Sequence, residues 1–207
     1  MYLSRVEVNK QRIETKRALM NPQVMHASVK ACFPESDERI LWRADTLGHN
    51  LYILIAAPTK PDFTTFIRQY GWPASGQSGE SRDYAKFLDR IAAGSGWRFR
   101  LTANPVHTVK DKIYAHVTAA EQRKWLFDRA ERNGFALRED AFDVVYRDVI
   151  RFFKGNKPDV RKVTLARASF EGVLIVTDAA LFRRALTNGI GRAKAYGCGM
   201  LTVVGLS

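Results

Sequence analysis

Alternating apolar and polar residues predict strands at both ends of the chain. The segment "MYLSRVEVN" (1–9) has the period of two that is typical of a half-buried strand. "GMLTVVGL" (199–206) is the last apolar run and predicts the closing strand. Between them, the apolar segments "ERILWRAD" and "NLYILIAAP" flank "TLGH", which predicts two strands joined by a tight hairpin.

Helical spacing appears next in the first half of the chain. Asn21 and Pro22 form a favourable N-cap and first-turn pair, and Met25, Val29 and Cys32 then recur on one side of a helix over 21–33. "PDFTTFIRQY" (61–70) predicts a second helix, and we expect a further strand within 84–92. The order of elements is β-α-β-β-α-β.

The same order recurs in the second half. A strand is predicted over 97–106, where Asn104 and Pro105 bend or end it, and a helix over 118–135 begins with the capping box of Thr118 and Glu121. Residues 140–153 and 162–178 are rich in β-branched and aromatic residues and predict strands. A helix over 178–188 follows, with Gly189 expected as its left-handed cap.

This repetition predicts an α+β fold of two tandem ferredoxin-like, or RRM-like, β-α-β-β-α-β domains. We place the boundary between an N-terminal domain of residues 1–95 and a C-terminal domain of residues 96–207. A chain of 207 residues suits two domains of about 100 residues each, and 46% hydrophobic residues suffice for real cores.

Charge narrows the range of partners. The chain carries 33 Lys and Arg against 21 Asp and Glu, a net charge of +12, which favours a polyanion. The longest apolar run, "LYILIAAP", is far shorter than the roughly 20 residues of a spanning helix, and the N-terminus does not resemble a secretory signal. The two cysteines form no CxxC pair, so we expect reduced thiols and a cytoplasmic protein that binds nucleic acid, not membrane.

A glycine-rich, basic segment, "TNGIGRAKAYGCGM" (187–200), precedes the last strand. It is not a dinucleotide fingerprint, because it follows a helix and has Lys194 where the third glycine would stand, and no P-loop sequence is present. A helix cap accounts for Gly189. We expect Gly191, Arg192 and Lys194 to face an RNA strand or groove.

Several of these segments together resemble the CasE family, the repeat-RNA endoribonucleases of type I-E CRISPR systems. The resemblance lies in "NGIGRAKAYGCGMLTV", "FEGVLIVTD", "FRLTANPV" and the opening "MYLSRVEV", and it spans the chain. It implies tandem ferredoxin-like domains, binding of a CRISPR repeat stem-loop and metal-independent cleavage by the ribose 2′-OH. It also implies that the product stays bound within the Cascade complex, against its backbone subunit.

Such cleavage needs a general base and a general acid, and histidine suits either role near neutral pH. His26 lies on the first predicted helix, with Gln23 and Lys30 on the same side. The family's catalytic histidine sits on this helix shortly before an "-FP" ending, which "MHASVKACFP" matches. The family has tyrosine three residues before this histidine. Gln23 can donate a hydrogen bond to phosphate but cannot act as a general acid, so Lys30 is expected to stabilise charge.

The other three histidines are weaker candidates for a catalytic role. His49 lies in the predicted hairpin, while His107 and His116 flank the basic loop "HTVKDKIYAH", where they can touch RNA or simply face solvent. Their spacing to cysteines and carboxylates is not that of a metal site. We therefore expect no metal and no cofactor.

Two basic surfaces are candidates for binding the RNA stem. The segment "RFFKGNKPDVRK" (151–162) lies between two predicted strands, and the family uses a comparable basic element of its second domain. Arg98 and Arg100 alternate with Phe99 and Leu101, which predicts one cationic strand face. A-form RNA is recognised by its shape and backbone, which suits such surfaces. The candidates in the basic segment are Lys154, Lys157, Arg161 and Lys162.

Two alternatives to the nuclease stay open. The first is a non-catalytic subunit that holds a repeat hairpin, which Gln23 in place of tyrosine would fit. The second is an RRM-like single-strand binder, which ranks last because the sequence lacks RNP-type aromatic pairs.

Overall fold

The computed structural model describes residues 1–35, 38–77, 79–155 and 160–206. The chain forms two compact units. The first comprises Met1–Lys86 with Arg151–Val163 and Ala195–Gly197, and the second comprises Phe87–Ile150, Thr164–Lys194 and Cys198–Ser207. Two short segments from the C-terminal half thus belong to the first unit. The division of the linear chain at residues 95 and 96 stays a prediction.

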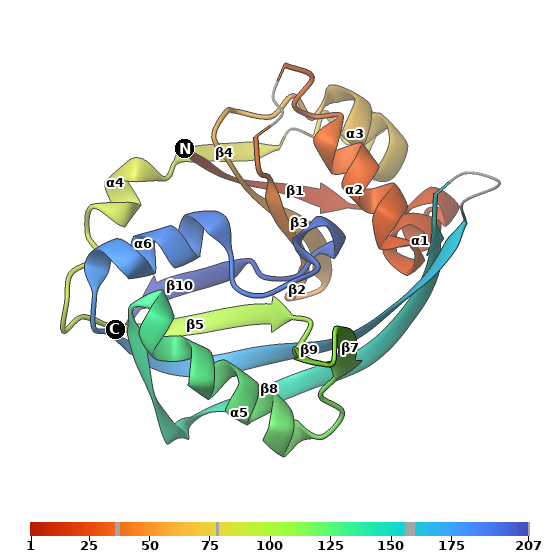
Figure 1. Cartoon of the computed structure of the whole chain (residues 1–207). Helices are drawn as coiled ribbons and strands as arrows, with labels where there is room; N and C mark the ends of the chain where they lie inside the picture. Colours follow the sequence, from red (N-terminus) through yellow and green to blue (C-terminus); the bar gives the residue numbers. More distant parts are fainter. Residues whose placement is uncertain (36–37, 78, 156–159, 207) are drawn as a thin grey trace. The chain divides into compact units, whose positions relative to one another are not determined.

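The first unit is built on a four-stranded antiparallel sheet in the order β2-β3-β1-β4, which is that of a ferredoxin-like domain (Figure 1). Its elements are β1 (Tyr2–Val8), α1 (Ile13–Met20), α2 (Pro22–Lys30), β2 (Leu41–Leu47), β3 (Asn50–Ala57), α3 (Thr64–Tyr70), the 3₁₀ turn η1 (Pro73–Ser75) and β4 (Glu80–Asp83).

The core of this unit lies between the sheet and its helices. Val6 on β1 pairs with Ile53 on β3, and both are almost fully buried. Met25 and Val29 of α2 pack in the same cluster, together with Phe66 of α3. Burial of this stripe fixes α2 on the sheet and leaves the adjoining side of the helix for other contacts.

The second unit repeats the arrangement with a sheet in the order β10-β5-β9-β8 (Figure 1). Phe99 and Leu101 of β5 are buried, and Trp125 of α5 stacks on Phe170 of β9 with ring centroids 6.2 Å apart. The elements that lie wholly or partly in this unit are α4 (Ala85–Leu88), β5 (Gly96–Ala103), β6 (Val106–Val109), β7 (Lys112–Ala115), α5 (Ala119–Ala130), η2 (Glu131–Asn133), β8 (Phe135–Lys154), β9 (Arg161–Val176), α6 (Ala179–Asn188), η3 (Lys194–Tyr196) and β10 (Leu201–Gly205).

The tandem ferredoxin-like fold predicted from the sequence is confirmed, although one strand was misplaced. The prediction of a strand within 84–92 is wrong. This segment begins with the short helix α4, and the strand is β4 at Glu80–Asp83. β4 has the sequence "ESRD" and is an edge strand without buried residues. A strand with little burial shows no apolar alternation to detect.

Three further features differ from the predictions. Helix α1 precedes α2 and was not predicted, and the supposed basic loop 107–116 contains a two-stranded hairpin, β6–β7. Gly189 has the positive φ expected of it (71°), but its ψ of 163° is extended, so it is not a left-handed cap. No helix in the described ranges is long and apolar enough to cross a membrane.

Candidate active site

Helix α2 positions the principal candidate residues. The side chain of Asn21 accepts a hydrogen bond from the backbone N–H of Gln23 (3.2 Å), and Pro22 occupies the first turn, as the sequence predicts. With Met25 and Val29 buried against the sheet, the side of α2 that carries Gln23, His26 and Lys30 is partly or fully exposed. The three candidates therefore share a helix face.

His26 is half-buried, and its Nδ1 atom is enclosed without a hydrogen-bond partner among the described residues. The pKa of His26 is lowered from its ordinary value, mainly by burial and further by the positive charges of Lys30 and Lys154. Because protonation is disfavoured, the neutral imidazole predominates near pH 7. A neutral imidazole is the form that can accept a proton.

Lys154 joins this site from a distant part of the chain. It is the last residue of β8 and belongs to the segment Arg151–Val163 of the first unit, the same unit as His26. Its charge acts on the imidazole directly. The sequence indicated a basic segment here, but nothing in it paired Lys154 with His26, because that proximity is made by the fold.

Two further candidates of the basic segment lie at the start of β9. Arg161 and Lys162 are exposed there and present their charges to solvent. Lys157 lies outside the described residues. The described cations of the basic segment thus lie at the end of β8, where Lys154 stands, and at the start of β9.

The outward face of β5 is less cationic than the alternation predicts. Phe99 and Leu101 point into the core while Arg98 and Arg100 point outward. Arg100 forms an ion pair with Glu171 on β9 (3.2 Å), which offsets its charge. Arg98 stands opposite Val173 and Val204 and is exposed.

Backbone conformation and a close contact explain why glycine stands at one position of the glycine-rich segment. Gly197 has a φ of 77°, and a Cβ there would lie 3.0 Å from the Trp42 ring. The indole N–H of Trp42 also donates to the Ala195 carbonyl oxygen (3.2 Å), so residues 195–197 dock on β2 within the first unit. In the second unit, Gly191 and Arg192 are exposed and Lys194 is half-buried.

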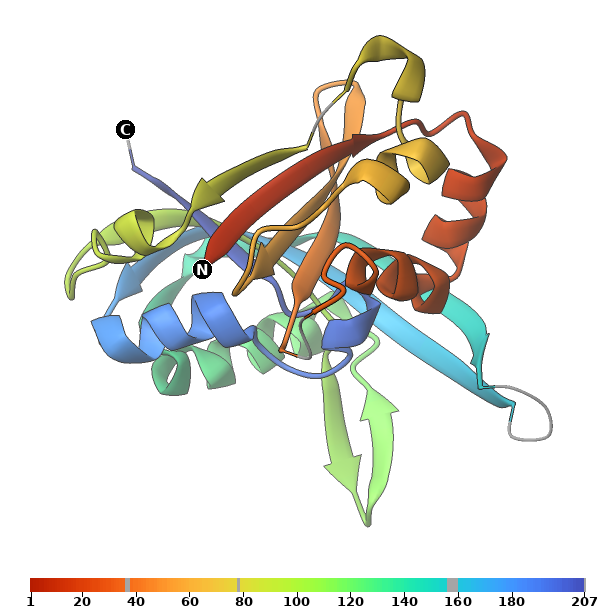
Figure 2. The ribbon, with the colours of Figure 1, turned by 90° about the horizontal axis from the view of Figure 1, so that it is seen from above.

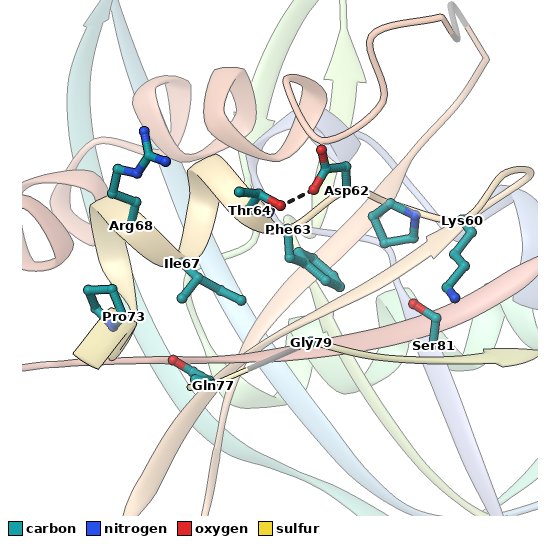
Figure 3. A pocket seen from close by; sticks show the side chains of 11 residues that line it. Lys60, Asp62, Phe63, Thr64, Ile67, Arg68, Pro73, Gln77, Gly79 and Ser81 are labelled. Atoms are coloured by element: carbon teal, nitrogen blue, oxygen red, sulfur yellow. Dashed lines mark hydrogen bonds between the residues drawn. The ribbon is translucent and has the colours of Figure 1, made fainter. Parts of the chain in front are cut away.

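A pocket of about 430 Å³ also occurs in the first unit, beside α3 (Figure 3). Its walls are apolar at Phe63 and Ile67, with Lys60 and Arg68 at its border (Figure 3). Asp62 accepts a hydrogen bond from the backbone N–H of Thr64 (2.8 Å), so its carboxylate serves the local turn. None of the candidate residues lines this pocket.

The described residues bring few potential metal ligands together. Among residues 1–35, 38–77, 79–155 and 160–206, no three His, Cys, Asp or Glu side chains gather in a way that could hold a metal ion. His107 and His116 do approach each other, with ring centroids 4.6 Å apart. In the part of the chain that the structure describes, no third ligand of these types joins them.

Comparison with known proteins places the chain in a family. The sequence profile of the CRISPR-associated protein family matches residues 1–204, nearly the whole chain. The chain belongs to the CasE/Cse3 family of CRISPR-associated proteins. The resemblance identified from the sequence motifs is thereby confirmed.

Individual members support this assignment. The CRISPR-associated endoribonuclease Cse3 of Thermus thermophilus is 28% identical over 98% of this chain and 99% of its own. The Cascade subunit CasE of Escherichia coli is 32% identical over 56% of this chain and 62% of its own. A structure of the endoribonuclease Cse3 bound to a 19-nucleotide RNA has a TM-score of 0.83 at 26% identity, covering 99% of this chain and all of that one.

Proposed function

We propose that this CasE/Cse3 family member is a metal-independent endoribonuclease that cleaves CRISPR repeat stem-loop RNA to produce mature guide RNA. The observation that carries the proposal is the match over almost the full length of both chains to an endoribonuclease, and to its RNA-bound structure. The net charge of +12 suits an RNA substrate. The product stays bound, and the protein serves as a Cascade subunit in the cytoplasm, against the backbone subunit.

The reaction uses groups of the protein and of the RNA alone. His26 takes the proton of a ribose 2′-OH, and the resulting oxygen attacks the adjacent phosphorus. The bond from phosphorus to the 5′-oxygen breaks, and that oxygen receives a proton. One product ends in a 2′,3′-cyclic phosphate and the other begins with a 5′-hydroxyl.

The electrostatics of α2 favour His26 as the base. Its lowered pKa keeps the imidazole neutral and ready to accept a proton. Lys30 and Lys154 place positive charge beside it, where negative charge develops on the phosphate oxygens in the transition state. Gln23 donates a hydrogen bond to a phosphate oxygen, and a group other than Gln23 protonates the leaving oxygen.

Cations of the basic segment, of β5 and of the glycine-rich segment bind the stem. We assign phosphate contacts to Arg161 and Lys162 on β9, together with Lys157, and to Arg98 on β5. In the glycine-rich segment, the backbone of Gly191 and the charged side chain of Arg192 contact the RNA. Lys194 adds a second positive charge there. Arg100 contributes less, since Glu171 offsets its charge. We keep residues 1–95 and 96–207 as the proposed N- and C-terminal domains.

Cleavage of the cognate repeat RNA in excess EDTA, followed in single turnover, tests the proposal. We expect the wild type to cut and His26→Ala to bind the RNA but cut about 10²- to 10⁴-fold more slowly. Binding of the stem-loop without cutting by either protein would support the alternative, a subunit that only holds the repeat hairpin.

A further inference from the structure

The hairpin β6–β7 displays a row of aromatic rings. His107 on β6 pairs in register with Tyr114 on β7, and their rings stack with centroids 5.9 Å apart and an interplanar angle of 26°. The ring of His116, just beyond β7, lies 4.6 Å from that of His107. Tyr114 is 48% exposed, so the end of the row is open to solvent.

The rings of His107 and Tyr114 lie on one face of the hairpin. Figure 2 shows this hairpin as the green ribbon at the lower centre, projecting from its unit. Residues directly opposite in an antiparallel pair share a face, so Thr108 and Ile113 lie on the other side. His107 and Tyr114 are both exposed, so their rings do not pack into a core. Their exposure instead suits a partner with flat faces.

The turn of this hairpin points to an anionic partner. Lys110 and Asp111 both have positive φ, 45° and 62°, a conformation that two-residue turns ordinarily give to Asn and Gly. A lysine side chain at such a position is strained, and strain of this kind is typical of functional segments. Lys110 and Lys112 are exposed and form no ion pair within the described ranges.

A pocket of about 570 Å³ begins at the base of the hairpin, where Val117 and Gln122 line it. The Gln122 side chain is only 3% exposed and donates from Nε2 to the His116 carbonyl oxygen (2.9 Å). Its Oε1 atom is enclosed and has no hydrogen-bond partner among the described residues. An enclosed acceptor in this position suits the exocyclic amine of a nucleobase.

We infer that this face of the second unit binds unpaired nucleotides of the RNA, outside the stem. A base stacks on Tyr114 and His107, its phosphate lies near Lys110 and Lys112, and a base edge reaches Gln122 in the pocket. Stacking on aromatic side chains beside cations is how proteins hold single-stranded RNA. The inference rests on the proposed function, since it assigns a second part of the same substrate.

The test compares two RNAs, the repeat stem-loop with its single-stranded flanks and the same stem-loop without them. The ribose whose 2′-OH attacks the scissile phosphate is replaced by its 2′-deoxy form, so that the RNA is bound without being cut during the titration. We expect Tyr114→Ala to weaken binding of the flanked RNA about 5- to 150-fold. The affinity for the bare stem-loop should stay unchanged. The measurement is a titration followed by fluorescence anisotropy at fixed salt.

Ile113→Ala is the matched control, because Ile113 is the neighbouring residue, is 55% exposed and lies on the opposite face. It should leave both affinities unchanged. Equal binding of the flanked RNA by wild type and Tyr114→Ala would overturn the inference. So would loss of assembly with the other Cascade subunits at undiminished RNA affinity, since the hairpin would then be a protein contact. A wild type that binds neither RNA would instead refute the proposed function.

Discussion

Lys154 on β8 lies close enough to His26 on α2 for its charge to lower the pKa of the imidazole. The two residues belong to the same compact unit although β8 comes from the C-terminal half of the chain. A cation beside a base has two consequences. It keeps the base unprotonated at lower pH, and it stabilises negative charge that appears on a phosphate nearby.

Replacing Lys154 by Met should therefore shift the pH dependence of cleavage. A base works only when unprotonated, so the rate falls as pH drops through the pKa of His26. Loss of the nearby charge raises that pKa toward its ordinary value, and the acidic limb of the profile moves to higher pH. We also expect the plateau rate to fall about tenfold or more. Single-turnover rates between pH 5 and 8 measure both effects.

Lys162→Met is the control for this experiment, because Lys162 is an exposed cation of the same basic segment that does not contribute to the pKa shift of His26. It should weaken RNA binding without moving the acidic limb. Identical pH profiles for wild type and Lys154→Met at saturating RNA would remove Lys154 from the active site.

Gln23→Ala should cost less than the loss of His26. A neutral hydrogen bond to a phosphate oxygen contributes about 0.5–1.5 kcal/mol, or roughly 2- to 10-fold in rate. Loss of general base catalysis costs about 10²- to 10⁴-fold. Single-turnover rates of the two variants at saturating RNA make the comparison. A decrease as large as that of His26→Ala would mean that Gln23 has a role beyond a hydrogen bond.

Local signals made much of the fold predictable. Gly48 and His49 join β2 to β3, with Leu47 paired to Asn50, as the hairpin pattern predicts. Asn21 and Pro22 begin α2 where expected. Periodicity fails where burial is slight, as in the polar strand β4. Helix α1 buries only Thr15 and Ala18, so the apolar face that would mark this segment as a helix in the sequence is equally weak.

The candidate site was predictable only in part, for a different reason. His26 and Lys30 are four residues apart on one helix, so helical spacing places them together. Lys154 lies near His26 because the segment Arg151–Val163 belongs to the first unit. The ion pair of Arg100 with Glu171 depends on the register of β5 and β9. Contacts between strands distant in sequence leave no local periodicity.

The packing of Gly197 on Trp42 predicts a stability cost for a methyl group. Gly197→Ala places a Cβ 3.0 Å from the indole in a left-handed conformation. We expect a loss of about 2–3 kcal/mol, of which the backbone conformation accounts for about 1–2 kcal/mol. Urea unfolding gives the free energy. Gly76→Ala is the control, since its φ is 66° and no atom lies within 4 Å of the added Cβ. Equal costs for both variants would mean that the Trp42 contact contributes nothing.

The ion pair of Arg43 and Asp45 on β2 leads to the last prediction. Both side chains are buried, with 2% and 3% exposed, and the guanidinium donates two hydrogen bonds to the carboxylate (2.8 and 2.6 Å). Removing Asp45 takes these two hydrogen bonds and the opposite charge away from a buried guanidinium. We therefore expect Asp45→Ala to lower the free energy of unfolding by about 3–5 kcal/mol, measured by urea denaturation.

The pair of Arg138 and Asp140 on β8 is the matched control, because it has the same spacing on a strand and the same two-pronged contact at 3.2 and 2.7 Å. Its side chains are 78% and 70% exposed, so water replaces the partner when it is lost. Asp140→Ala should leave the unfolding midpoint unchanged. If both variants lose the same stability, then burial does not set the strength of the Arg43–Asp45 pair, and the desolvation argument for it is wrong.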